Sequence, residues 1–181
     1  LVAPVALVAM GRFNHEAVAV HPDGTIVYQT EDRLDGLLYR FLPDEPGNLA
    51  AGGRLQALMV RDRPALDTRN WTDSAIAPGD KLAVGWIDLD EVESPKDDLR
   101  VQGASRGAAI FSRGEGIYTG SDGIYVSCTS GGRKQEDAID GTGQIWRYVP
   151  SRFEGTGEED RAPGTLELIF EPNDDSVLDK G

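Results

Sequence analysis

The chain has 181 residues, a mass of 19.5 kDa and a formal net charge of −13. This acidity argues against binding to a nucleic-acid backbone, which needs clustered Lys and Arg. The single cysteine, Cys128, excludes an internal disulfide and a cysteine-based zinc site. The apolar run at residues 1–10 is too short to cross a bilayer and lacks the basic start of a signal peptide. We therefore predict neither a membrane span nor a targeting signal.

Four short strands are predicted in the first third of the chain, where apolar, β-branched and aromatic residues alternate or run together. The dipeptide Asp23-Gly24 predicts a hairpin turn between the first two strands, because glycine adopts the positive φ that such turns need. The predicted strands lie at residues 17–20, 25–30, 37–42 and 55–60.

The middle of the chain does not follow this pattern. Residues 81–89 predict one further strand. Residues 91–100 are charged and polar, and they predict a solvated loop or a short helix broken by Pro95. We interpret residues 61–107 as an irregular insertion.

The last third of the chain repeats the first. Glu16 lies seven residues before Asp23, and Glu115 lies seven residues before Asp122 of a second Asp-Gly turn. Two later segments of the first copy also have counterparts in the second. The matched segments are 39–43 with 146–150, and 53–58 with 164–169. Matched elements in the same order indicate an internal duplication.

Each copy has the pattern of a four-stranded antiparallel meander, which is the unit of a β-propeller blade. A β-sandwich is the competing fold, but its strands do not usually repeat as matched quartets. We predict an all-β chain that holds two blades of an incomplete β-propeller, at residues 15–60 and 108–172, with the insertion between them. A closed propeller needs about four to eight blades. We therefore expect the missing blades to come from the rest of a longer parent chain or from another chain.

Glu16 and Glu115 are candidate metal ligands. The first strand of each propeller blade is innermost, so both carboxylates would reach one rim of the central channel. Converging carboxylates repel one another, and a bound cation relieves that repulsion. Calcium, iron and manganese all accept carboxylate oxygens. The alternative is that the equal spacing reflects the duplication alone.

Arg113 lies two residues before Glu115, so the two side chains would share one side of the strand. Its planar guanidinium suits a phosphate group, while the alternative is an ion pair with Glu115. His15 points to the other side and is predicted to pack or hydrogen-bond rather than bind metal. Residues 31–33 are predicted to form a solvated loop, and Cys128 is expected to be a buried structural thiol.

Several segments together resemble the bacterial alkaline phosphatase PhoX family. They cover most of the chain apart from the insertion. The segments are Met10–Val20, Tyr28–Arg33, Arg113–Gly116, Gly143–Tyr148 and Leu166–Asp174.

This resemblance implies a decorated β-propeller that hydrolyses small phosphomonoester substrates with iron and calcium ions. It implies that Glu16 and Glu115 match metal ligands of the family, that Arg113 matches an arginine near the substrate phosphate, and that the protein is periplasmic or secreted. The family's metal-binding cysteine belongs to a segment before the matched Gly-Arg-Phe motif, and Cys128 does not match it. We therefore expect an isolated piece of this length to bind metal weakly and to be a poor enzyme.

Two other functions fit the same pattern. One is a non-catalytic β-propeller module that binds a partner or serves as a scaffold. The other is a different calcium-dependent propeller hydrolase, such as a lactonase-like enzyme.

Overall fold

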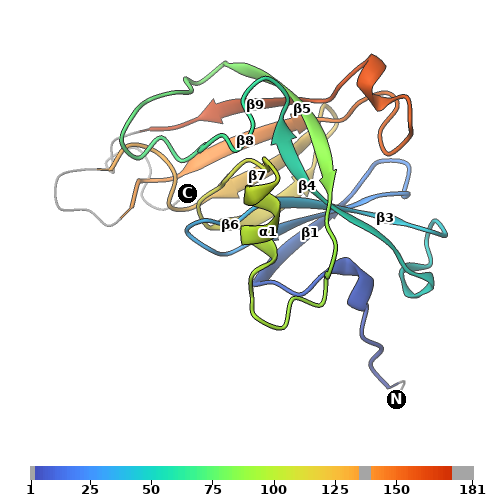
Figure 1. Cartoon of the computed structure of the whole chain (residues 1–181). Coiled ribbons are helices and arrows are strands. Elements are labelled where there is room, and N and C mark those ends of the chain that lie inside the picture. Colours follow the sequence, from blue (N-terminus) through green and yellow to red (C-terminus); the bar gives the residue numbers. More distant parts are fainter. Residues whose placement is uncertain (1–2, 135–139, 173–181) are drawn as a thin grey trace.

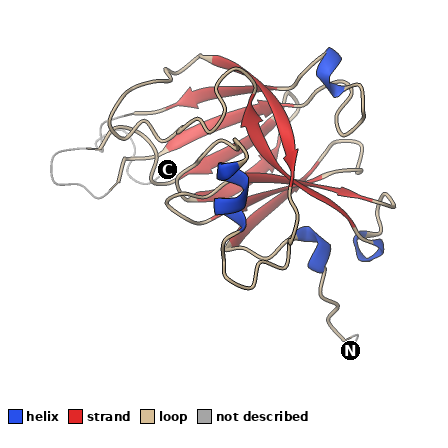
Figure 2. Cartoon of the chain, viewed as in Figure 1, coloured by secondary structure: helices blue, strands red, loops and turns tan. Residues whose placement is uncertain are grey.

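The computed structural model of the chain describes residues 3–134 and 140–172. Nine antiparallel strands form one strongly curved sheet in the order β1-β2-β3-β4-β5-β9-β8-β7-β6 (Figure 1). Helices in the described ranges are short (Figure 2): α1 (Leu99–Ser105) and the 3-10 turns η1 (Val8–Met10), η2 (Leu49–Ala51) and η3 (Glu159–Arg161). The all-β prediction is confirmed.

Both predicted quartets of strands are present. The first quartet consists of β1 (His15–Val20), β2 (Val27–Glu31), β3 (Leu38–Pro43) and β4 (Gly53–Val60). The second consists of β6 (Gly114–Thr119), β7 (Ile124–Cys128), β8 (Gln144–Val149) and β9 (Thr165–Phe170). Each quartet is an antiparallel meander, as its hairpin turns and alternating residues predict.

The insertion contributes β5 (Lys81–Asp88), the strand predicted at residues 81–89. β5 pairs with β4 along most of its length and with β9 through its first residues, so it joins the two quartets into one sheet. The sheet curves until its two end strands, β1 and β6, lie side by side. The blade limits at residues 15–60 and 108–172, with residues 61–107 as an insertion, remain a prediction.

The two quartets pack head to tail. Tyr39 of β3 lies in a core that α1 covers with Leu99. The matching Trp146 of β8 instead lies in a second core, where it packs with Leu38 from the other face of β3. A two-fold sandwich would bury matching residues in one shared core between its sheets. Head-to-tail packing is the arrangement of neighbouring propeller blades, and it favours the incomplete propeller over the sandwich.

Arg40 of β3 faces the core between the quartets and is only 2% exposed. Its guanidinium donates to Glu154 at 2.7 Å and to Glu159 at 2.6 and 2.7 Å, and it lies 4.5 Å above the ring of Trp86. Both glutamates belong to the loop that follows β8. A buried charge is stable only when it is paired and hydrogen-bonded, so Arg40 fastens this loop of the second quartet over the first.

In the described part of the chain, no helix has the length and apolar character needed to cross a membrane.

Candidate functional site

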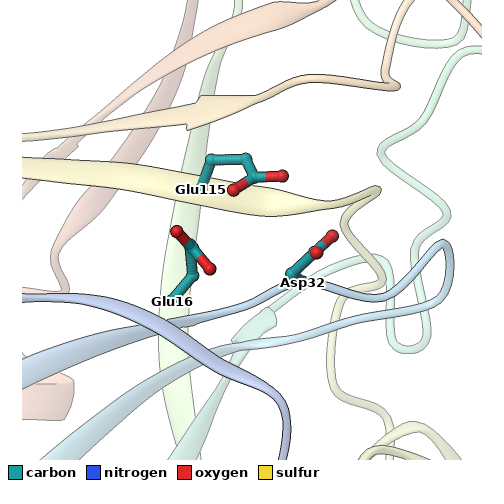
Figure 3. A group of neighbouring side chains, drawn as sticks. All are labelled: Glu16, Asp32 and Glu115. Carbon is teal, nitrogen blue, oxygen red and sulfur yellow. The ribbon is translucent and has the colours of Figure 1, made fainter.

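Three carboxylates converge where β1 and β6 meet. Glu16 belongs to β1, Asp32 follows the end of β2, and Glu115 belongs to β6. One oxygen of each carboxylate lies within 4.8 Å of an oxygen of the other two. Figure 3 shows the three side chains turned toward a common point. The structure brings Glu16 and Glu115 together, as the repeat predicts, and their metal-binding role remains a prediction.

A β-bulge positions each glutamate. The pairing of β1 with β2 shifts register between His15 and Val18, and the pairing of β6 with β7 shifts between Gly114 and Ile117. These two intervals occupy the same place in the repeat, and each contains its glutamate. Bulges bend a strand and redirect its side chains. The duplicated bulge is therefore the local reason that both glutamates turn toward the seam between β1 and β6.

The backbone beyond the bulge is also duplicated. The N–H of Asp32 donates to the carbonyl of Asn14 at 3.0 Å, and the N–H of Thr129 donates to the carbonyl of Arg113 at 3.1 Å. Asp32 and Thr129 thus occupy matching positions, as do Asn14 and Arg113. The first quartet supplies two carboxylates to the site, whereas the second supplies one carboxylate, a guanidinium and a hydroxyl.

Thr30 fastens the two bulges to each other. Its hydroxyl donates to the backbone carbonyl of Glu115 at 2.6 Å and accepts from the N–H of Ala17 at 3.1 Å. Gly114 allows this approach, because a Cβ at that position would lie 3.3 Å from the Cβ of Thr30. The separation between Glu16 and Glu115 is therefore set by direct contacts between the quartets.

Arg113 joins two of the three carboxylates. Its Nε donates to Asp32 at 2.7 Å, and its Nη2 donates to Glu115 at 2.7 Å. The ion pair with Glu115, which the sequence left open as an alternative to a phosphate-binding role, is present. The backbone of Arg113 has φ of 51°, and its N–H donates to the carbonyl of Arg33 at 2.7 Å. A non-glycine residue in this left-handed region is uncommon and often occurs at functional sites.

The charges in this cluster affect one another. Burial raises the pKa of Glu115, and the negative charges of Asp32 and Glu16 raise it further against the opposing effect of Arg113. The pKa of Arg113 is raised chiefly by its hydrogen bond to Asp32. Three carboxylates face a single guanidinium here, so the repulsion among them is only partly relieved. An added cation would relieve the remainder.

The prediction of a solvated loop at residues 31–33 is wrong for Glu31, whereas Asp32 and Arg33 lie in a partly exposed loop. Glu31 is the last residue of β2 and is 1% exposed, with the hydroxyl of Tyr39 donating to it at 2.7 Å. Burial raises the pKa of Glu31 to about 7. Asp32 is the third carboxylate of the site, and Arg33 forms an ion pair with Asp97 at 2.6 Å.

Asp32 is the residue that sequence reasoning missed. Counting outward from the Asp23-Gly24 turn places it beside the start of β1, and the bulge then sets it opposite Asn14. This count of residues from the turn is the one sequence signal that points to Asp32. It does not reveal a bulge, which changes the register and the direction of the side chains that follow.

Two other predicted assignments agree with the structure. The Nε2–H of His15 donates to the carbonyl of Gly11 at 3.0 Å and the ring stacks on Phe13, so His15 has a packing and hydrogen-bonding role. Cys128 is fully buried, and burial raises the pKa of its thiol to about 12. Both observations place these residues outside the carboxylate group.

Comparison with known proteins gave one match. The family model described as alkaline phosphatase PhoX matches residues 1–179. Neither the search of curated proteins nor the search of solved structures found a match. The family match spans nearly the whole chain, including both quartets and all three converging carboxylates. The protein therefore belongs to the alkaline phosphatase PhoX family.

Proposed function

We propose that this chain supplies part of the active site of a metal-dependent phosphomonoester hydrolase. Glu16, Asp32 and Glu115 would bind calcium and iron ions, and Arg113 would bind the substrate phosphate. The observation that supports the proposal most directly is the convergence of three carboxylates within 4.8 Å beside a guanidinium. Membership of a phosphatase family supports the reaction class and a small phosphorylated substrate.

The donor set fits a hard cation. Calcium binds oxygen ligands at about 2.3–2.6 Å, so two oxygens on one ion lie at most about 5 Å apart. The observed limit of 4.8 Å meets this condition for all three carboxylates. Iron also accepts carboxylate ligands. Three carboxylates alone fill only part of a calcium coordination shell, and water, substrate or other protein groups would supply the rest.

In the proposed site, some residues would stabilise charge and others would orient the charged groups. When bound, such ions supply Lewis-acid polarisation of a phosphoryl oxygen. Arg113 would donate to the phosphoryl oxygens, where its fork stabilises the charge that shifts as the ester bond breaks. With Asp32 and Glu115 serving as metal ligands, the guanidinium of Arg113 would be available to the phosphate. The hydroxyl of Thr129, 3.5 Å from Glu115, helps to orient that carboxylate.

The ion pairs of Arg113 also leave a second function open. A non-catalytic propeller module would keep Arg113 as a permanent counter-ion for Asp32 and Glu115. The two functions differ in what removal of the guanidinium does. In the hydrolase, the change reduces turnover and leaves the carboxylates free to bind metal. In the module, it only destabilises the seam.

The test uses the full-length parent protein with calcium and iron supplied, and measures metal binding by calorimetry and hydrolysis of p-nitrophenyl phosphate. We expect Glu16→Gln, Asp32→Asn and Glu115→Gln each to weaken metal binding by more than the roughly 10–100-fold typical of lost supporting contacts. We expect Arg113→Gln to lower kcat/KM by about 10²–10³-fold, with metal affinity unchanged or higher. The exposed Glu45→Gln is the control.

Metal affinity and activity that do not respond to Glu115→Gln would remove that residue from the site. Parallel loss of metal, activity and folding in Arg113→Gln would favour the structural module. We also expect the parent protein in the periplasm or outside the cell, because this location is typical of the family.

A further inference from the structure

A cavity of about 440 Å³ opens beside the carboxylate cluster. Asp32 belongs to the cluster, and both Asp32 and Arg113 line the cavity, so the alcohol part of a phosphomonoester held by Arg113 would lie next to the cavity. This volume lies within the range of small-molecule sites. The lining residues are Asn14, Asp32, Arg33, Leu34, Asp35, Arg100 and Arg113.

The lining is polar and nearly balanced in charge. Leu34 is its one apolar member, and no aromatic ring lines the cavity among the described residues. Arg100 is paired with Asp35 at 2.9 Å, and Arg33 is paired with Asp97 at 2.6 Å. These ion pairs hold the guanidinium groups in place and leave little net charge beyond the cluster.

The cavity wall carries both hydrogen-bond donors and acceptors. Arg33 and Arg100 offer N–H groups, Asp35 offers carboxylate oxygens, and the amide of Asn14 carries both kinds of group. A hydroxyl group both donates and accepts, so it can bind to such a wall at many points. An apolar ring would cover these groups without replacing their bonds to water, which costs binding energy.

We propose that this cavity binds the leaving group and selects phosphomonoesters of small, hydroxyl-rich alcohols such as sugars and polyols. The proposal rests on the proposed function, because it assumes that the phosphate binds at Arg113. In the reaction, the bond from phosphorus to the ester oxygen breaks, water supplies the new oxygen on phosphorus, and the alcohol leaves with a proton from that water. Arg33 and Asp35 would bind hydroxyls of the alcohol and act only on specificity.

The experiment compares substrates in the full-length parent protein with calcium and iron supplied. Glucose 6-phosphate and glycerol phosphate represent hydroxyl-rich esters, and p-nitrophenyl phosphate represents an aryl ester. We expect Arg33→Gln and Asp35→Asn each to lower kcat/KM for the first two roughly tenfold, which corresponds to one or two lost hydrogen bonds. We expect the value for p-nitrophenyl phosphate to stay within about twofold.

Arg106 provides a matched control for Arg33. Its side chain is 39% exposed, against 42% for Arg33, and it pairs with Asp90 at 2.8 Å away from the cavity. Arg106→Gln should leave kcat/KM unchanged for all three substrates. The proposal would be overturned if Arg33→Gln and Asp35→Asn lowered kcat/KM equally for aryl and hydroxyl-rich esters, or lowered it for neither. A preference of the wild-type protein for a sugar bisphosphate would also overturn it.

Binding separates this proposal from the proposed function. If no phosphomonoester is hydrolysed, the hydrolase function fails, and calorimetry then compares inorganic phosphate with a non-hydrolysable sugar phosphonate. Binding of the phosphonate that is at least about tenfold tighter, and that is lost in Arg33→Gln, would still support the cavity as a hydroxyl-binding subsite. Equal binding of the two ligands would refute it.

Discussion

Arg40 in the first quartet is 2% exposed, whereas the matching Arg147 in the second quartet is 23% exposed. Both arginines pair with two carboxylates: Arg40 with Glu154 and Glu159, Arg147 with Asp122 and Glu167. The difference comes from the head-to-tail packing, because the second quartet covers the face of the first that carries Arg40, whereas the corresponding face of the second, which carries Arg147, is more exposed. The same position of the repeat thus forms a buried ion pair in one copy and a partly exposed ion pair in the other.

Removal of the buried arginine should have the largest effect. Arg40→Met leaves Glu154 buried without its cation, and breaking such a pair costs about 3–5 kcal/mol of unfolding free energy. Arg147→Met should cost less, because Arg147 and Asp122 are partly exposed and water can replace some of the lost contacts. Urea unfolding of the two variants measures the difference. Equal losses would show that the second quartet does not shield Arg40.

Glu31 and Cys128 also occupy matching positions, because each pairs across its hairpin with the residue that begins the bulge. Burial raises the pKa of Glu31 from 4.5 to about 7, so the folded chain holds this proton more tightly than the unfolded chain. The stability that the proton provides is complete below pH 4.5 and is lost as the pH rises to about 7. The loss is about 3 kcal/mol.

Glu31→Gln should remove this pH dependence, since the amide keeps an acceptor for Tyr39 without titrating. Cys128→Ser serves as the control, because a thiol with a pKa of about 12 stays neutral over the same range. Unfolding free energies measured between pH 4.5 and 8 in the presence of a chelator test the prediction. A wild-type slope equal to that of Glu31→Gln would contradict it.

The smallest predicted effect concerns the two Asp-Gly turns, whose aspartates both have lowered pKa values. A hydrogen bond from the Thr25 hydroxyl at 2.6 Å lowers the pKa of Asp23 to about 2, and a hydrogen bond from Tyr125 lowers the pKa of Asp122. The stability from Asp23 is present above its ordinary pKa of 3.8 and is lost as the pH falls toward 2.

Carboxyl-carbon NMR titration can follow both aspartates. In Thr25→Ala, the pKa of Asp23 should rise toward 3.8 while that of Asp122 stays where it is. A pKa of Asp23 that does not respond to the substitution would show that the turn geometry, rather than the threonine, stabilises the carboxylate.

The sequence predicted what local pattern and repetition determine. The Asp-Gly turns located the hairpins, and the equal spacing of Glu16 and Glu115 predicted their convergence. The position of Asp32 could not be predicted, because a bulge is not visible in residue alternation. The junction made by β5 was also hidden, since a strand of 8 residues does not show which two neighbours it will pair with.

The curved sheet closes at β1 and β6 without a ladder of backbone bonds between these two strands in the described ranges. The three carboxylates lie across that opening, two from one edge and one from the other. A ligand that engages all three would therefore also fasten the free edges together. When such a ligand saturates the three carboxylates, amide hydrogen exchange should slow along both β1 and β6, including at amides far from the oxygens that contact the ligand.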